Sequence, residues 1–155
     1  MEGKPRPAAS APEAIRAMDD LVATSVVGQQ EFARNLGLSV TDLSCFAYVL
    51  EAGDSPVTAG DLAGRAHVTT GAVTGILNRL ERGGFVTRGP DPDDRRRVRV
   101  TAVPTAAERV QAVYRPYSAL LMELFADYTP DETAVLADWF TRAATLARTY
   151  LEESC

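Results

Sequence analysis

Residues 69 to 82 combine a helical apolar pattern with polar side chains suited to hydrogen bonding. Val73, Ile76, Leu77 and Leu80 recur at positions i, i+3, i+4 and i+7 of a helix. At about 100° per residue, the opposite side holds small and polar residues. Asparagine can pair bidentately with adenine, arginine with guanine, and a threonine methyl or bare backbone can lie against a thymine methyl. The candidate DNA-reading residues are Thr69, Thr70, Gly71, Thr74, Gly75, Asn78, Arg79 and Arg82.

Three consecutive arginines, Arg95, Arg96 and Arg97, form a second candidate contact. They follow Asp91, Asp93 and Asp94, and two stretches of alternating residues, 85–88 and 97–101, flank this charged run. Two-residue alternation predicts a β-hairpin with the arginines at its tip. Arginines at such a tip suit a narrow, electronegative minor groove, and Arg88 could contact a DNA phosphate. The alternative for both segments is an ordinary solvated surface.

The sequence gives little support for catalysis, metal binding or a reactive cysteine. No nucleophile, base and orienting group are clustered, and no phosphate-binding loop occurs, so an enzyme is not expected. With one histidine and two cysteines the chain has no metal-ligand cluster, and no cofactor is predicted. His67 fits a polar turn residue. Cys45 lies in an apolar segment, which favours a buried, inert thiol over an oxidant sensor.

Charge is distributed unevenly along the chain. The formal net charge is -5, yet residues 61 to 99 hold eight arginines against five acidic residues. A basic island on an acidic body can bind phosphate at the island and repel it elsewhere. The acidic total therefore does not exclude a nucleic-acid partner.

The remaining pattern supplies the helices that would position these residues. Pairs at capping-box spacing, Ser10 with Glu13 and Thr105 with Glu108, predict two helix starts, and Thr129-Pro130 predicts a third. Pro116 should kink the helix that contains it. The predicted helices span 10–37, 41–52, 58–66, 69–82, 105–127 and 129–152.

This order predicts a mainly α fold with a small β-hairpin wing: a winged helix-turn-helix joined to a helical dimerisation region. Residues 1–9 read as a flexible tail, 38–103 as the DNA-binding region, and 10–37 with 104–152 as the dimerisation region. The outer helices carry more apolar surface than a small winged helix can cover, so a homodimer is expected. Its partner would be double-stranded DNA with a pseudo-palindromic operator.

The stretch from Leu38 to Arg99 resembles the MarR (multiple antibiotic resistance regulator) family. The similarity rests on Asp61-Leu62-Ala63, on the residues from Leu80 to Arg88, and above all on the wing sequence 91–96. The resemblance implies that Asp94 positions an inserted Arg96. It also implies interlocked outer helices, and a small effector, often phenolic, bound near the junction of dimer and DNA-binding regions.

Two readings of function therefore stand. The first is a cytoplasmic transcriptional regulator, a repressor whose DNA affinity a small molecule modulates, with no membrane association because no apolar run approaches the roughly 18 residues of a span. The second is a winged-helix module that binds protein instead of DNA. The salt dependence of binding distinguishes the two functions. Each phosphate contacted on DNA adds about -0.9 to the slope of log affinity against log salt concentration.

Overall fold

The computed structural model describes residues 7–53, 55, 57–66, 68–91 and 98–154. Of the described residues, those between Ala11 and Arg115 form one compact unit, and 116–154 form a second with 7–10. The predicted division placed the helix at 10–37 and the whole of 104–152 apart from the winged helix. In the structure, residues 11–37 and 104–115 belong to the same unit as the winged helix.

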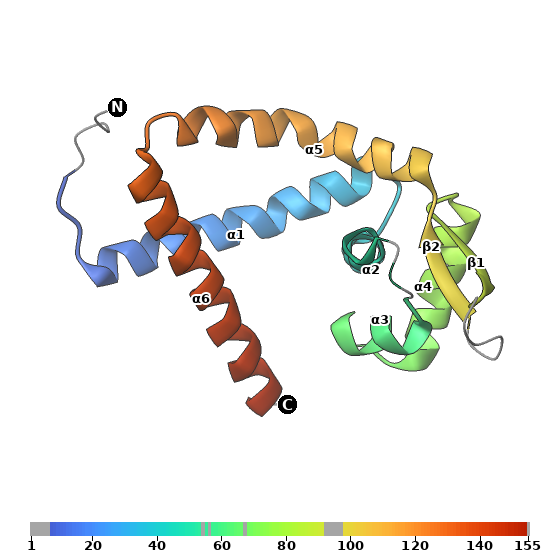
Figure 1. Ribbon diagram of the computed structural model, residues 1–155. Helices are drawn as coiled ribbons and strands as arrows, with labels where there is room; N and C mark the ends of the chain where they lie inside the picture. The colour runs from blue at the N-terminus through green and yellow to red at the C-terminus, as the bar shows by residue number, and fades with distance from the viewer. Residues whose placement is uncertain (1–6, 54, 56, 67, 92–97, 155) are drawn as a thin grey trace. The chain divides into compact units, whose positions relative to one another are not determined.

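The larger unit contains the winged helix-turn-helix (Figure 1). Its helices are α2 (Val40–Ala52), α3 (Ala59–Ala66) and α4 (Thr70–Arg82), followed by strands β1 (Val86–Pro90) and β2 (Val98–Ala102). The strands pair antiparallel from Val86 opposite Ala102 to Pro90 opposite Val98. Val57 adds a bridge to Val100, donated by the Val100 amide at 2.9 Å, which the sequence did not predict. A mainly α fold with a hairpin wing is thus confirmed.

Side-chain caps fix where the short helices begin. The α4 helix starts after Thr69, whose hydroxyl accepts a hydrogen bond from the Ala72 amide at 3.2 Å. At α3, Thr58 and Asp61 form a reciprocal pair, with the Thr58 amide donating to the Asp61 carboxylate at 2.8 Å. Such caps satisfy amides that have no partner inside the helix. The α2 cap is Ser39, two residues before the predicted start at Thr41.

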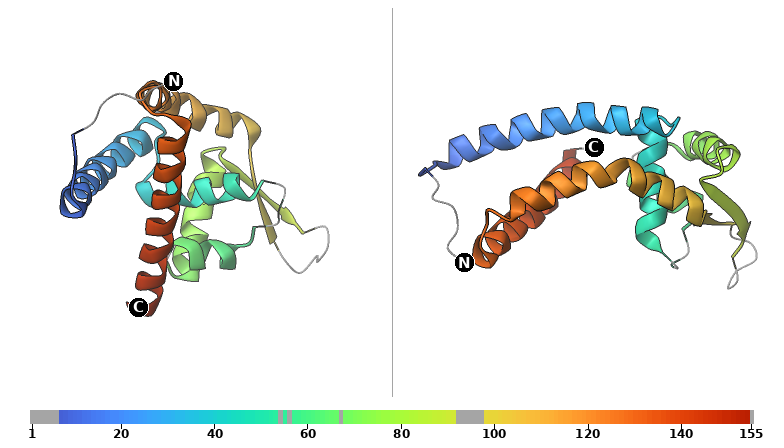
Figure 2. Two further views of the ribbon diagram at one scale, coloured as in Figure 1. Left: turned by 60° about the vertical axis from the view of Figure 1, so that its left-hand side comes forward. Right: turned by 90° about the horizontal axis from the view of Figure 1, so that it is seen from above.

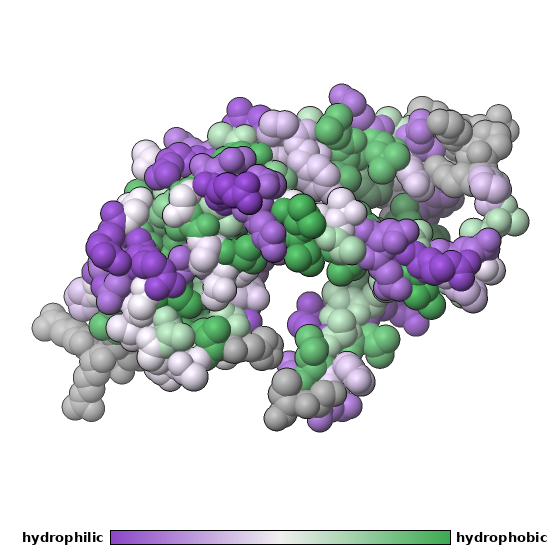
Figure 3. All heavy atoms as spheres, turned by 180° about the vertical axis from the view of Figure 1, so that it is seen from behind, coloured by the Kyte–Doolittle hydropathy of each residue, from purple (hydrophilic) through white to green (hydrophobic). Residues whose placement is uncertain are grey.

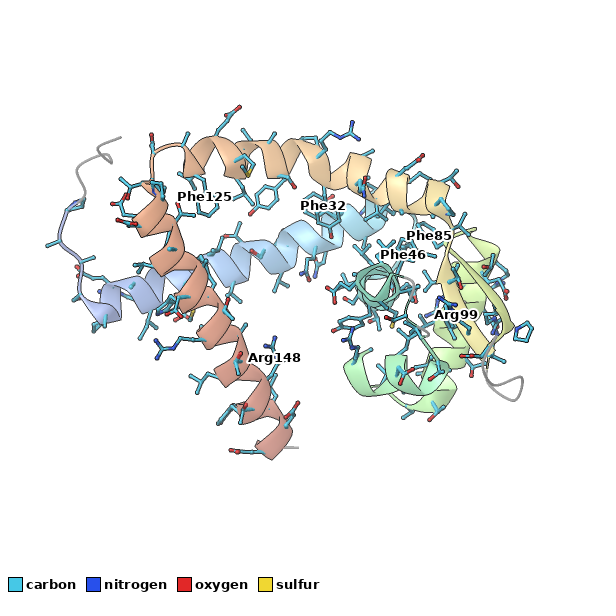
Figure 4. All side chains as sticks on the ribbon, viewed as in Figure 1. Phe32, Phe46, Phe85, Arg99, Phe125 and Arg148 are labelled. Atoms are coloured by element: carbon cyan, nitrogen blue, oxygen red, sulfur yellow. The ribbon has the colours of Figure 1, made fainter. Side chains whose placement is uncertain are left out.

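The core of this unit lies between the helices and the hairpin. Phe46 of α2 and Phe85, just before β1, meet edge to face with ring centroids 5.3 Å apart (Figure 4). The predicted apolar side of α4, including Leu80, is buried against them. Removing one such buried leucine typically costs about 2–5 kcal/mol. This packing holds one side of α4 inward and leaves the polar side accessible.

The outer helices are α1 (Ala11–Asn35), α5 (Pro104–Phe125) and α6 (Pro130–Ser154). In Figure 2, α1 is seen along its length in the right-hand view and α6 in the left-hand view. At α6 the predicted start is confirmed, because the Thr129 amide donates to Glu132 Oε2 at 2.8 Å. The predicted Thr105–Glu108 cap is wrong: α5 begins at Pro104, and the Val103 carbonyl accepts its first hydrogen bonds. A proline suits the first helical position, where its missing N–H costs no helical bond.

Pro116 lies inside α5, at the boundary between the two units. Within the described residues, no helix has the length and apolar character needed to cross a membrane.

Candidate nucleic-acid interface

The polar side of α4 is exposed along its whole length. Most of the predicted reading residues have accessible side chains or backbone, and Gly75 is half-buried. The helix therefore presents the surface expected of a reading face, opposite its buried apolar side. The exposed members are Thr69, Thr70, Gly71, Thr74, Asn78, Arg79 and Arg82.

Packing against the described residues does not require glycine at either of the two glycine positions of this face. A Cβ built at Gly71 would meet no atom within 4 Å, and one at Gly75 would meet only an Arg79 side-chain nitrogen, at 3.5 Å. Neither glycine has a positive φ, in contrast to Gly84 (φ 70°) in the turn after α4. Glycine in a helix interior is about 1 kcal/mol less favourable than alanine. The missing side chains therefore leave room for something outside the chain.

The threonines of the face are partly engaged with the helix itself. The Thr74 hydroxyl donates to the Thr70 carbonyl at 3.3 Å, and the Thr69 hydroxyl serves the cap. Such local bonds are characteristic of threonine near a helix terminus. The hydroxyls of Thr69 and Thr74 are thus already partnered within the chain.

Arg79 is held by a carboxylate that sequence reasoning did not identify. Its Nε and one terminal nitrogen donate to Asp42 at 3.0 and 2.7 Å, a bidentate pair between α4 and α2. The Asp42 side chain is 4% exposed and the Arg79 side chain 48%. Arg79 was predicted to contact DNA, but this pairing leaves only the other edge of its guanidinium accessible. No local signal could reveal the pair, because 37 residues separate the partners.

The environment of Asp42 favours its charged form. Burial by itself would raise the pKa of this carboxyl, but hydrogen bonds from Arg79 and Ser39, with the Arg79 charge, hold the pKa below its ordinary value of 3.8. A carboxyl group whose pKa is lower in the folded protein than in the unfolded chain stabilises the fold. That stabilisation is fully present at any pH above the pKa of the unfolded state. That stabilisation is lost as the pH falls through the folded-state pKa.

We expect Asp42→Asn to lower the melting temperature at neutral pH, because Arg79 loses its charged partner. The difference from wild type should shrink as the pH falls below 3.8 and through the lower folded-state pKa, because the wild-type side chain is then protonated and neutral, like that of asparagine. Thermal unfolding between pH 7 and pH 2.5 measures this. Asp138→Asn is the control, since its pair with Arg142 is exposed and contributes little. A difference that does not vary with pH would contradict the assignment.

A second arginine connects α4 to the hairpin. Arg88 Nε on β1 donates to the Glu81 carboxylate at 3.0 Å, and a terminal nitrogen donates to Asn78 Oδ1 at 2.8 Å and also contacts Glu81. The hydrogen bond from Arg88 is the main reason that the pKa of Glu81 is lowered. Arg88 was expected to contact phosphate, yet in the structure its guanidinium faces these internal partners.

The tip of the hairpin lies outside the described residues, and with it Asp94, Arg95, Arg96 and Arg97. Their predicted roles in the minor groove stay predictions. His67 also falls outside. Asp91, expected in the charged loop, is buried at 3% exposure directly after β1.

Cys45 is fully buried in α2, and burial together with nearby Asp42 raises the pKa of its thiol. Reactive cysteines have a lowered pKa and solvent access, so these features favour the inert interpretation. Among the residues that the structure describes, no cluster of three or more metal-ligating side chains occurs.

A small cavity of about 150 Å³ lies in the larger unit between α1, α2 and α5. Its walls are mainly apolar, and polar groups come from Gln29, Ser44 and Tyr114. Burial raises the pKa of Tyr114, so its phenol stays protonated and can donate a hydrogen bond. The Tyr114 ring also packs on Phe32, with centroids 4.3 Å apart. The remaining wall residues are Val40, Leu43, Phe46, Ala47 and Val110.

An exposed helix of small and polar residues, packed beside a paired hairpin, defines a winged helix-turn-helix DNA-binding protein. Residues 36–97 match the sequence profile of the MarR family. The uncharacterised HTH-type transcriptional regulator YcgE of Bacillus subtilis is 34% identical over 139 residues, which cover 90% of this chain and 89% of YcgE. The chain therefore belongs to the MarR family of transcriptional regulators, and the prediction of a regulator instead of an enzyme is confirmed.

Solved structures share the fold. Streptococcus pneumoniae FabT in complex with DNA is 22% identical, with a TM-score of 0.66 over 88% of this chain and 99% of FabT. S. aureus MepR bound to ethidium bromide is 16% identical, with a TM-score of 0.59 over 83% of this chain and 95% of MepR. At these identities the likeness supports the architecture alone.

Proposed function

We propose that this regulator is a homodimeric repressor that binds a pseudo-palindromic operator in double-stranded DNA. The observation that carries the proposal is the polar side of α4, where a Cβ at Gly71 would meet only open space. A helix that enters the major groove needs small residues where its backbone approaches the bases, and polar side chains that reach their edges. The DNA-bound structure of FabT supports the same use of this fold.

Unpartnered apolar side chains support the dimer. On α6, Leu146 is 73% exposed and Trp139 41% exposed, and Figure 3 shows hydrophobic surface on the C-terminal part of this helix. Monomers rarely expose contiguous apolar patches beyond a few hundred Å². A two-fold dimer would bury this surface against an identical one and present two α4 helices, about 34 Å apart, to successive major grooves. Large exposed apolar residues also occur on α1 and α5, among them Ile15, Val22, Val26, Leu120, Met122 and Leu124.

Gel-shift titration of the gene's own upstream DNA, repeated from low to high salt, tests DNA binding. Each neutralised phosphate should contribute about -0.9 to the slope of log affinity against log salt. A protein-binding module would show no sequence-selective complex. Repression is tested by transcription from the same promoter, which should rise when the gene is deleted.

A small aromatic effector fits the cavity between α1, α2 and α5. Its volume of about 150 Å³ is close to that of apolar cavities that take up one benzene ring. Gln29, Ser44 and Tyr114 offer hydrogen bonds to a phenolic hydroxyl. The ethidium complex of MepR supports effector binding by this fold. A ligand that binds one conformation of the protein more tightly than another increases the population of that conformation. If that conformation binds DNA less well, the ligand lowers the affinity for DNA.

We expect phenol to raise the melting temperature of the wild type and to weaken its operator complex. Ala47→Leu, which places extra volume at the half-buried wall, should remove both effects. Thermal-shift and gel-shift titrations measure them. An undiminished response in Ala47→Leu would locate the effector elsewhere.

A further inference from the structure

The contact between Arg88 and Asn78 bears on how the α4 helix reads DNA. Arg88 lies on β1, and its guanidinium bridges two residues of α4, Asn78 and Glu81. The Arg88 side chain is 29% exposed, whereas Asn78 lies on the exposed face that we propose enters the major groove. Asn78 is thus contacted from within the protein at one end of its amide.

The donor and acceptor properties of the two groups show which atom of the Asn78 amide is bonded to Arg88. A guanidinium has donors only, so the Asn78 atom 2.8 Å from Arg88 must be the carbonyl oxygen and not the NH₂ group. The ion pair with Glu81 holds the guanidinium in place, because a bridged arginine loses its freedom to turn away. Asn78 then has its oxygen engaged and its NH₂ donors available.

We propose that Arg88 is a positioning residue for base recognition, which makes Asn78 a hydrogen-bond donor in the major groove. This inference rests on the proposed DNA-binding function. A bidentate pair with adenine needs both the amide oxygen and the NH₂ group. It would have to share that oxygen with Arg88, which already uses one of the two lone pairs of Oδ1. A donor favours base-edge acceptors such as guanine N7 and O6 or thymine O4. The adenine pairing expected from the sequence is therefore disfavoured relative to recognition of acceptor-rich edges.

A purely structural role would have a different signature. The Arg88–Glu81 pair is partly exposed, and such pairs contribute little to stability. Loss of Arg88 should therefore change base preference much more than folding. Because β1 carries Arg88, the orientation of Asn78 also depends on where the hairpin lies relative to α4.

Selection of binding sites from random DNA tests the proposal with four proteins: wild type, Asn78→Ala, Arg88→Ala and the double variant. Asn78→Ala should lose its preference at one base pair of each half-site. Arg88→Ala should shift the preference at that same base pair toward adenine, by about tenfold. In the double variant, removal of Arg88 should cause no further change in preference at that base pair, because Asn78 is already absent. A fifth protein, Arg88→Lys, should retain part of the wild-type preference that Arg88→Ala loses. Arg65→Ala, which removes another exposed arginine–glutamate pair, is the matched control.

Nuclear magnetic resonance supplies a readout that needs no DNA. The Asn78 side-chain amide signals should shift in Arg88→Ala and stay unchanged in Arg65→Ala. If the wild type selects no sequence, the proposed function fails, while these signals still report whether Arg88 holds Asn78. The inference is overturned if the Asn78 signals do not respond. It is overturned equally if Arg88→Ala weakens all sequences alike and reduces the salt slope by about 0.9, the behaviour of a phosphate contact.

Discussion

Replacement of Gly71 by leucine is expected to weaken specific operator binding about 100-fold or more. A Cβ at this position would meet no atom of the protein within 4 Å, and residue 71 is exposed, so a leucine side chain is expected to project outward from α4. In the major groove it would hold the helix away from the base edges, whose contacts are worth about 1–3 kcal/mol each. Gel-shift titration on the operator measures the loss.

Gly71→Ala is the matched control. Its methyl group is small enough for a close helix, so operator affinity should stay within a few-fold of wild type. Both variants should unfold at a higher temperature than wild type, because replacing a helical glycine is worth up to about 1 kcal/mol. Operator binding by Gly71→Leu at wild-type affinity would show that the base edges do not approach this side of α4.

The double variant Trp139→Glu/Leu146→Glu is expected to be monomeric and to lose about 100-fold or more in affinity for the full operator. Two charges on the exposed apolar side of α6 would have to be buried without partners in the dimer. Without the dimer, the second half-site is no longer bound intramolecularly at a high effective concentration. Analytical ultracentrifugation and gel shift on the full palindrome measure the two effects.

Thr145→Glu introduces the same charge on the same helix, at an exposed polar position, and should leave both properties unchanged. Circular dichroism confirms that each variant keeps its helices. A monomeric double variant with undiminished affinity for the palindrome would contradict the proposed dimeric recognition. So would a double variant that remains a dimer.

Sequence reasoning performed well where the signal is local. The bounds of α4, the hairpin and the Thr129 cap of α6 depend on residues within a few positions of one another. Helical periodicity, strand alternation and capping pairs act over that range, so they can be read directly. The start of α5 was misplaced because two local signals competed, and Pro104 overrode the Thr105–Glu108 spacing.

The contacts that refine the candidate interface depend on tertiary packing. Asp42 meets Arg79, and Val57 pairs with Val100, only after distant segments have come together. Even Arg88 and Asn78, ten residues apart, meet only because the hairpin folds back beside α4. A single sequence offers no periodicity that connects such partners. The types of the residues at the interface could thus be predicted, but not which of their atoms are free.

The ion pairs of the winged helix also affect how the protein searches a genome. Of the arginines in the basic segment, Arg65, Arg79 and Arg88 are paired with carboxylates of the protein itself. A cation already neutralised in this way releases few phosphate counterions, so it adds little to binding that ignores sequence. These three arginines therefore add little to the binding of random DNA by a chain whose net charge is -5. Fewer molecules are then sequestered on the very many competing sites, and even a modest absolute affinity suffices to occupy the operator.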